Sequence, residues 1–525
     1  MKLFVRIAVI RGLARVITGA ALGVLTIAAG TLVATAPAQA STLNGPIGRD
    51  EIIDRAQNWV DRDITYTQTG TWASDPEGSH TYRRDCSGLV SMAWHLSRSY
   101  VTDDFQGDNA MWDTLGSLHD FQPGDAMVRS GHMELFSHWK NRNDHTEGAY
   151  VYSFNSDGQT VQNPYADNNT GARGFNGWSD LLSYKPIRRT GLDNSAGAKG
   201  PALVHDDGSS AMTIHRWTST GSSFARTSDY TSSGSYNLAA VGDRVASGDV
   251  TGDGVDDIVM AYQLGDGTFG FYVYKSGITS LGRWYTSGPF NLDPVGGRLV
   301  VGDFTGDGKA EPALVRDEGD GDMTIYRWIS TGTSFSRTTD YSSTGSFELA
   351  NVGDRVASGD VTGDGIDDIV MAYQLADGTF GYYVYKSGVN SLGRWYTSGQ
   401  YNLGPVGARL VVGDFTGDRK AEPALVHDDG GGAMTIHRWT SNGSSFSRTT
   451  DFTAPSFTVS QVGNRAASGD VTGDGIDDIV MTYQLGDGTF GHYVFRSGIS
   501  SLGRWYTSGQ YNLGPVDGRL VLGNW

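Results

Sequence analysis

The 525-residue sequence contains a single cysteine, Cys86, and this scarcity limits what the thiol can do. One thiol cannot form an internal disulfide, so Cys86 is a buried small hydrophobe, an intermolecular link or a nucleophile. The apolar residues that follow it, from Leu89 to Leu96, have helical spacing and predict a helix that begins near Ser87. A helix N-terminus stabilises negative charge, so this position favours a nucleophilic thiolate.

Positive charge is also scarce, with 40 Lys and Arg against 58 Asp and Glu and a net charge of −18. Four of the cationic residues precede an apolar stretch over residues 16–36, and Ala38-Gln39-Ala40 then has the small-x-small form of a cleavage site. The pattern predicts a signal peptide over residues 1–40 and a secreted protein, with an uncleaved anchor as the alternative. Removal of this segment takes the net charge to −22, which argues against nucleic acid or an anionic membrane as a partner.

Long hydrophobic runs are absent from the rest of the chain, so we expect no stable membrane insertion after signal cleavage. The remaining sequence divides by its patterns into a domain over residues 41–188, a linker over 189–199 and a repetitive region over 200–525. We expect the mature chain to be a monomer.

The repetitive region has a period of 111 residues, seen in Pro-Ala-Leu-Val at positions 201, 312 and 423. Each period contains two related units of about 55 residues, built from short apolar runs between Gly, Asp and Ser turns. Several short strands in each unit predict an all-β propeller with one unit per blade.

The two ends of this region predict the number of blades. The first unit, over residues 200–242, lacks the opening strand that other units show at Arg298 and Arg409, and a matching strand occurs over residues 519–525. A C-terminal strand that completes the first blade would close the ring and leave no exposed sheet edge. We therefore expect six blades; an open solenoid would end in polar caps, and none is visible.

Acidic loops recur at one place in five of the six units. The segment from Asp249 to Asp257 offers oxygen ligands at its first, third, fifth and ninth positions, a set that suits Ca²⁺. The predicted ligands are Asp249, Thr251, Asp253 and Asp257; Asp303, Thr305, Asp307 and Glu311; Asp360, Thr362, Asp364 and Asp368; Asp414, Thr416, Asp418 and Glu422; and Asp470, Thr472, Asp474 and Asp478. The fourth loop has Arg419 where the others have Gly, which predicts a strained turn and a weaker site. The ions are expected to be structural, and ordinary surface turns are the alternative.

These loops and their Gly-Asp-Phe-Thr-Gly-Asp-Gly context resemble the FG-GAP (VCBS-like) repeats of integrin-type propellers. The resemblance implies the propeller fold and calcium, and says little about function. Arg-Trp pairs recur once in each unit, ending at Trp217, Trp284, Trp328, Trp395, Trp439 and Trp505. They are either packing devices or platforms for stacking sugars.

A thiolate nucleophile needs a base, and the sequence offers one strong candidate. A Pro-Gly-Asp turn at residues 123–125 precedes two alternating runs that predict a hairpin, with His132 opening the second strand. His138, farther along the same strand, is the second choice.

The motifs Asp85-Cys86-Ser87-Gly88, Gln122-Pro123-Gly124-Asp125 and Gly131-His132 occur in an order that resembles the NlpC/P60 branch of papain-like cysteine peptidases. The resemblance implies an α+β papain-like domain with Cys86 as nucleophile and His132 as base. It places a polar orienting residue on the next strand, where Asn155 is the candidate and Ser153 the alternative. Tyr66, Asp85 and Ser87 would bind substrate.

Two functions follow from these features. By resemblance, the chain is a secreted cysteine peptidase or amidase that hydrolyses amide bonds of peptidoglycan through an acyl-thioester, with the propeller for targeting or spacing. No cofactor is expected for the catalysis. In the alternative, the chain is a non-catalytic cell-wall or carbohydrate-binding protein, lectin-like or adhesin-like, with an inactive N-terminal domain. Peptidoglycan or another cell-wall polymer is the expected partner.

Overall fold

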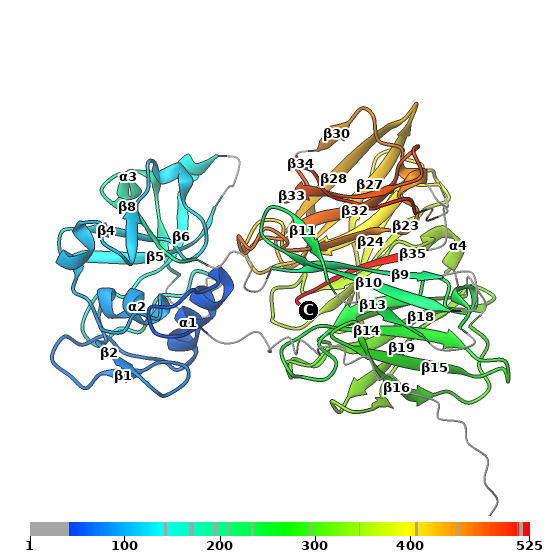
Figure 1. Cartoon of the computed structure of the whole chain (residues 1–525), viewed down its shortest axis with the longest axis horizontal. Coiled ribbons are helices and arrows are strands. Elements are labelled where there is room, and N and C mark those ends of the chain that lie inside the picture. The colour runs from blue at the N-terminus through cyan, green and yellow to red at the C-terminus, as the bar shows by residue number, and fades with distance from the viewer. Residues whose placement is uncertain are drawn as a thin grey trace, which may run out of the picture. The chain divides into compact units, whose positions relative to one another are not determined.

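A computed structural model describes residues 41–525 except 141–143, 167–172, 193–197, 207–210, 228, 233–235, 293–295, 346, 405–407, 450, 512 and 514–517. The predicted signal peptide therefore lies outside the described residues. In the part of the chain that is described, no helix has the length and apolar character that crossing a bilayer requires. Among the described residues, the strands form a two-stranded and a six-stranded sheet before residue 190 and six further sheets after residue 199. Figure 1 shows these two groups of strands.

The N-terminal part combines helices with an antiparallel sheet whose strand order is β3-β8-β4-β5-β6-β7. Its elements are α1 (Arg49–Asp61), β1 (Ala73–Ser74), β2 (Thr81–Tyr82), α2 (Cys86–Ala93), β3 (Trp112–Thr114), β4 (Ala126–Arg129), β5 (His132–Trp139), β6 (Ala149–Tyr152), β7 (Phe175–Asn176), α3 (Trp178–Leu181) and β8 (Lys185–Arg189). The predicted helix after residue 85 and the predicted hairpin, β4 with β5, are both present.

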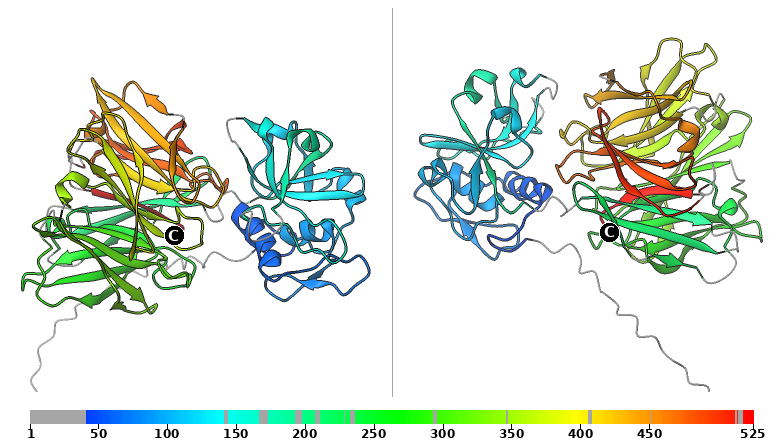
Figure 2. Two further views of the ribbon diagram at one scale, coloured as in Figure 1. Left: turned by 180° about the vertical axis from the view of Figure 1, so that it is seen from behind. Right: turned by 45° about the horizontal axis from the view of Figure 1, so that its top comes forward.

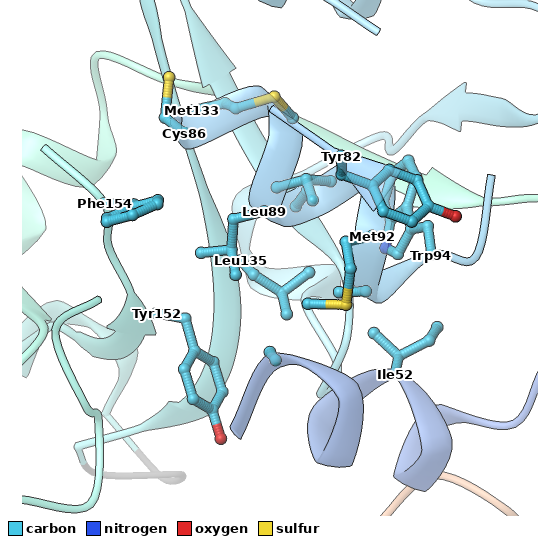
Figure 3. Packing of buried hydrophobic residues seen from close by; sticks show 14 of the residues in the cluster. Ile52, Tyr82, Cys86, Leu89, Met92, Trp94, Met133, Leu135, Tyr152 and Phe154 are labelled. Carbon is cyan, nitrogen blue, oxygen red and sulfur yellow. The ribbon is translucent and has the colours of Figure 1, made fainter. Parts of the chain in front are cut away.

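Helix α2 begins at Cys86 because the residue before it caps the helix. The Asp85 carboxylate accepts a hydrogen bond from the Gly88 N–H at 2.7 Å, which satisfies one of the unpaired donors of the first turn. Leu89 and Met92 on the helix pack with Leu135 of β5 in one buried cluster (Figure 3). This packing fixes the start of α2 beside the start of β5.

The repetitive region forms six sheets, one for each predicted unit. Blade 1 contains β9 (Gly200–Asp206), β10 (Met212–Ser219), β11 (Phe224–Arg226) and β12 (Tyr230–Thr231); blade 2 contains β13 (Val245–Gly248), β14 (Asp257–Gln263), β15 (Phe269–Lys275) and β16 (Thr279–Thr286); blade 3 contains β17 (Gly297–Gly302), β18 (Glu311–Gly319), β19 (Asp322–Ser330), β20 (Phe335–Arg337) and β21 (Tyr341–Ser343). Helix α4 (Leu349–Val352) leads into blade 4, with β22 (Val356–Gly359), β23 (Asp368–Gln374), β24 (Phe380–Lys386) and β25 (Asn390–Thr397); blade 5 contains β26 (Ala408–Gly413), β27 (Glu422–Gly430), β28 (Ala433–Ser441), β29 (Phe446–Arg448) and β30 (Phe452–Ala454); blade 6 contains β31 (Ala466–Gly469), β32 (Asp478–Gln484), β33 (Phe490–Arg496) and β34 (Ser500–Thr507).

The last strand, β35 (Gly518–Gly523), joins the sheet of blade 1 and closes the ring. It pairs antiparallel with β9, with Leu522 opposite Pro201, and becomes the innermost strand in the order β11-β10-β9-β35. Figure 2 shows this red strand beside the green strands of blade 1. The innermost strands contact one another in a closed cycle, β35-β13-β17-β22-β26-β31. The predicted six-bladed propeller is confirmed, and the missing strand is the inner one.

The Arg-Trp pairs are packing devices in the odd-numbered blades. Trp217, Trp328 and Trp439 are at most 2% exposed, and each lies in the core cluster that its blade shares with the preceding one. In the even-numbered blades Trp284 is half-buried against the Phe335 ring, with a centroid distance of 5.1 Å. A buried indole cannot stack on a sugar, which excludes Trp217, Trp328 and Trp439 as sugar platforms.

Closure by β35 predicts an unequal response to two leucine substitutions. Leu522 is buried at 4% exposure in β35, whereas Leu502 on the outer strand β34 is 40% exposed. Leu522→Ala should lower the free energy of unfolding by about 2–5 kcal/mol, because it removes buried methyl groups at the closure. Leu502→Ala should change it by less than about 0.5 kcal/mol. Urea unfolding followed by circular dichroism checks both values, and equal effects would contradict closure by β35.

Candidate functional site

The thiol of Cys86 and the ring of His132 meet where α2 packs against β5. Cys86 is the first residue of α2 and His132 the first residue of β5, and a hydrogen bond joins the thiol to the imidazole. The backbone of Met133 adds a hydrogen bond to the sulfur, and Thr102 Oγ1 lies 3.8 Å from Sγ. Figure 3 shows Cys86 and Met133 side by side at the edge of the buried cluster.

A buried carboxylate supports the imidazole from its other side. Glu134, two residues along β5 and only 4% exposed, places Oε1 3.3 Å from His132 Nε2. The Ser153 hydroxyl and the Asn176 amide both donate hydrogen bonds to the Glu134 carboxylate. These bonds hold Glu134 ionised and aimed at the histidine.

Cys86, His132 and Glu134 shift one another's pKa values. Burial opposes ionisation of the Cys86 thiol, but the hydrogen bond and the charge of His132 outweigh burial and lower the thiol pKa. Burial also disfavours the imidazolium, yet hydrogen bonds to Cys86 and Glu134 raise the pKa of His132 to about 9. The pKa of Glu134 is lowered despite its burial, mainly by the hydrogen bonds from His132 and Ser153. These shifts favour a thiolate-imidazolium pair over the neutral pair, and the thiolate is the state in which a cysteine is nucleophilic.

The third predicted member of this cluster requires a correction. Asn155 is exposed, and its side chain lies against Ser153, with Oδ1 2.7 Å from Ser153 Oγ, so it does not orient His132. Ser153, the alternative, donates to Glu134. The orienting residue is Glu134, which lies on the face of the strand that His132 occupies because side chains alternate along a strand. A lone acidic residue within the buried run of β5 was the signal that could have identified it.

The predicted substrate-binding residues have structural contacts. Asp85 caps α2 and pairs with Arg83 at 2.8 Å, and the Ser87 hydroxyl donates to the Asp85 carboxylate at 3.2 Å. Tyr66 is 8% exposed, and its hydroxyl accepts a hydrogen bond from Gln68 at 2.9 Å. These contacts position the start of the helix and give no sign of a substrate.

His138, the second choice for the base, lies elsewhere on β5. Its Nδ1 is 3.0 Å from Ser137 Oγ, and its ring stacks on Tyr165 with a centroid distance of 5.3 Å. Of the two candidates, His132 is the one that hydrogen-bonds the thiol.

All five acidic loops have the same turn, organised by their first aspartate. In the first loop, Asp249 accepts hydrogen bonds from the Gly252 and Gly254 N–H groups at 2.6 and 2.7 Å. In the fourth, the N–H of Arg419 donates to Asp414 at 2.7 Å, with Arg419 at φ 62°. The predicted strained turn is confirmed, because a non-glycine residue is held in the left-handed region.

The loops divide into two kinds at their ninth position. Where this residue is glutamate, the loop brings three carboxylates within 4.8 Å of one another, as in Asp303, Asp307 and Glu311 and in Asp414, Asp418 and Glu422. Burial raises the pKa of Glu311 and that of Asp414 to about 7, as expected for crowded carboxylates. Where the residue is aspartate, as at Asp257, the side chain accepts backbone hydrogen bonds from Thr251 and Ser276, and the described residues show no such group of three carboxylates at that loop.

In each loop, the aspartate at the fifth position forms an ion pair with a lysine or arginine side chain. The ion pairs are Asp253 with Lys275, Asp307 with Lys309, Asp364 with Lys386, Asp418 with Lys420 and Asp474 with Arg496. These pairs compensate part of the loop charge in all five loops, so the glutamate at the ninth position is what distinguishes the two kinds.

Aromatic side chains line a cleft between blades 3 and 4. A cavity of about 160 Å³ is bounded there by Ser343, Thr344, Phe347, Met371, Tyr373, Tyr383 and Tyr385. The Phe347 and Tyr373 rings are 5.7 Å apart, and the Tyr373 and Tyr383 rings are 6.0 Å apart. The cleft thus combines aromatic walls with the hydroxyl groups of Ser343, Thr344 and three tyrosines, and its size limits it to a small ligand or one part of a larger one.

The equivalent cleft between blades 5 and 6 is filled by its own side chains. Phe457 is only 7% exposed, and its ring lies 4.3 Å from Tyr483 and 5.3 Å from Tyr493. Phe347, its counterpart, is half-buried and leaves the cleft between blades 3 and 4 open.

Comparisons with known proteins give no matching family model and no matching curated protein. Among solved structures, AofleA from Arthrobotrys oligospora is 10% identical with a TM-score of 0.38, over 63% of this chain and 90% of that one. The six-bladed fucose-recognising lectin of Aleuria aurantia is 13% identical with a TM-score of 0.32, over 60% and 96%. The Dos1 propeller is 8% identical with a TM-score of 0.30, over 60% and 74%. At these identities the likeness concerns the propeller fold alone.

These comparisons correct the predicted activity. No family model of a cysteine peptidase or of FG-GAP repeats matches, and the structural neighbours include fungal lectins and no hydrolase among those described above. The prediction of a cysteine peptidase or amidase acting on peptidoglycan is corrected accordingly, because none of these comparisons supports it.

The protonation of the Cys86 cluster predicts how the thiol reacts. Iodoacetamide should label Cys86 in the native chain with an apparent pKa below the ~8.5 of a free thiol, so that labelling slows only as the pH falls through that lower value. His132→Ala should raise the apparent pKa, because the stabilising positive charge is lost, and Glu134→Gln should raise it less.

His138→Ala serves as the matched control, since it removes a histidine from the same strand without touching the thiol. Labelling rates measured from pH 5 to 10 by mass spectrometry distinguish the variants. A thiol that reacts only in denaturant, or an equal effect of His132→Ala and His138→Ala, would contradict the thiolate-imidazolium pair.

Proposed function

We propose that this chain is a secreted, non-catalytic carbohydrate-binding protein whose propeller binds glycans in clefts between blades. The observation that carries the proposal is the aromatic cavity between blades 3 and 4. Secretion rests on the signal-like pattern of residues 1–40. A cell-wall polymer or another polysaccharide is the partner that fits this function.

The chemistry of the cleft suits a sugar ring. Aromatic faces such as that of Tyr383 pack against the C–H faces of a pyranose, while the Ser343 and Thr344 hydroxyls offer hydrogen bonds to its hydroxyl groups. The net charge of −18 opposes polyanionic chains, so neutral glycans are the expected class. Fucosides, which the fungal lectin recognises, belong to this class.

The N-terminal part enters the proposal as a binding or spacing module. The order of its motifs supports an NlpC/P60-like domain over residues 41–188 in a non-catalytic role, and the loop spacing supports FG-GAP-like repeats over 200–525. We propose the thiolate of Cys86 as a reactive group, without assigning it a hydrolytic reaction.

Calcium is the proposed structural ion of the acidic loops. The residues fit it, because each loop presents several carboxylate oxygens on a tight turn, and the two glutamate loops gather three carboxylates within 4.8 Å. Ca²⁺ supplies charge neutralisation there and takes no part in glycan chemistry. We expect the tightest binding at the loops that end in Glu311 and Glu422.

Glycan binding should depend on the open aromatic cleft. Tyr383→Ala removes one wall of the cavity and should weaken binding of a neutral glycan about tenfold, a change of roughly 1.4 kcal/mol. The matched control is Tyr493→Ala, which changes the equivalent tyrosine in the filled cleft and should alter the affinity less than about twofold.

The measurement is isothermal titration calorimetry of the full chain with neutral mono- and oligosaccharides, fucosides included, identified first on a glycan array. Thermal melts confirm that both variants are folded. Equal affinities for Tyr383→Ala and the parent, or an array with no bound glycan, would contradict the proposal.

Calcium removal should destabilise the propeller. A bound ion stabilises the folded state by about 2.7 kcal/mol at a concentration 100 times its dissociation constant, so EDTA should lower the melting temperature and added Ca²⁺ should restore it. Glu311→Gln should reduce this calcium response more than Asp257→Asn, because Glu311 belongs to a three-carboxylate cluster. Scanning calorimetry with and without EDTA tests this, and an unchanged melt would show that the loops are ordinary turns.

A further inference from the structure

Histidine and carboxylate side chains gather on the face of blade 5 that adjoins blade 4. His427 and Asp429 alternate along β27, and His437 lies diagonally across on β28, where His427 pairs with Thr435 and His437 with Leu425. Tyr401 comes from the segment that follows β25 of blade 4. We call Tyr401, His427, Asp429 and His437 the blade 5 cluster.

The polar atoms of the blade 5 cluster converge. His427 Nδ1 lies 3.0 Å from Asp429 Oδ1, and the Tyr401 hydroxyl lies 2.5 Å from His437 Nε2. One ligand atom each from His427, Asp429 and His437 fall within 4.8 Å of one another. Two imidazoles and a carboxylate at this separation match the ligand set of a transition-metal site.

The outer contacts of the cluster resemble the supporting shell of a metal site. At the other nitrogen of His437, Nδ1 accepts a hydrogen bond from Arg448 Nη2 at 2.7 Å, and the Asp451 carboxylate that pairs with Arg448 lies 3.2 Å away, where it could accept from Nδ1 once a metal ion takes Nε2. The Thr435 hydroxyl donates to Asp429 Oδ2 at 2.5 Å. Metal-bound histidines commonly hydrogen-bond a carboxylate through the nitrogen that does not bind the metal, which fixes the ring.

We propose that the blade 5 cluster binds a late first-row divalent cation, of the Zn²⁺ class, through His427, Asp429 and His437. Imidazole nitrogens favour Zn²⁺ and its neighbours over Ca²⁺, which selects oxygen ligands. This site is therefore chemically distinct from the acidic loops. The side chains of His427 and Asp429 are 15% and 34% exposed, so a cation can reach them from solvent.

Blade 3 carries a different set at the same four positions and supports the assignment. There Phe290 replaces Tyr401, Arg316 replaces His427, Glu318 replaces Asp429, and Tyr326 replaces His437. Arg316 pairs with Glu318 at 2.7 Å and lies over the Phe290 ring at 4.2 Å, and the Tyr326 hydroxyl donates to Glu318 at 2.6 Å.

The guanidinium of Arg316 thus supplies, within the chain, the positive charge that blade 5 would take from a metal ion. Blade 3 has neither of the two proposed metal-binding histidines. It also has a phenylalanine in place of Tyr401, whose hydroxyl lies beside them in blade 5. A coordinated change of this kind is expected when one set of side chains binds a cation and the other replaces it.

Blade 1 resembles blade 5 in its two histidines. His205 and His215 have ring centroids 6.3 Å apart, and His215 Nε2 lies 2.7 Å from the Tyr511 hydroxyl. The aspartate that would complete this set, at position 207, lies outside the described residues. The proposal is therefore confined to blade 5, and its test must compare the metal content of two variants.

The test is a Zn²⁺ and Co²⁺ titration of the full chain carrying Cys86→Ser, which removes the thiol as a competing ligand, in excess Ca²⁺. The test variant adds Tyr401→Phe, His427→Arg, Asp429→Glu and His437→Tyr, which installs the set that blade 3 already accommodates. Calorimetry should show one equivalent of Zn²⁺ fewer in the test variant. The Co²⁺ complex of the parent should also show d–d absorption bands that the test variant lacks.

A second pair of variants keeps the test decisive if the fourfold variant does not fold. Asp451→Asn removes the carboxylate behind His437 and should weaken Zn²⁺ binding about 10- to 100-fold at this site. Asp340→Asn changes the corresponding aspartate of blade 3, which pairs with Arg337, and should leave Zn²⁺ binding unchanged. Equal Zn²⁺ stoichiometry and affinity in the parent and these variants would overturn the proposal.

Discussion

The antiparallel pairing of β35 with β9 is the interaction on which the propeller depends. Six residue pairs join the last strand of the chain to the first strand of the repeats, so the ring has no open edge between its ends. Because the innermost strands contact in one cycle, this closure also fixes the positions of the neighbouring blades. The clefts between blades exist only because the ring holds successive blades side by side.

The two-unit period creates three copies of each kind of cleft, and the copies differ in their side chains. The aromatic cleft is open between blades 3 and 4, whereas Phe457 fills its counterpart between blades 5 and 6. The polar cleft carries His427 in blade 5 and Arg316 in blade 3. The repeats thus provide a common scaffold, and substitutions at a few positions give separate clefts separate chemistry.

Features that depend on periodicity or on local spacing were predictable from the sequence. These include the six blades, the closing strand at Arg519 and the helix that begins at Cys86. The support of His132 by Glu134 was missed, because the resemblance pointed to the next strand, where Asn155 proved to be exposed. The difference among the acidic loops was missed because it depends on how far a carboxylate reaches, which spacing alone does not show. The activity was mispredicted because a few matching motifs do not determine a reaction.

The central claim is that the propeller binds a glycan in an open cleft between blades. A crystal structure of the full chain with a neutral oligosaccharide selected by binding tests this claim most directly. The account predicts a sugar ring in the cavity between blades 3 and 4, packed against Tyr383 and hydrogen-bonded near Ser343 and Thr344. A glycan bound only at the N-terminal part, or a cleft that stays without sugar at saturating concentration, would contradict it.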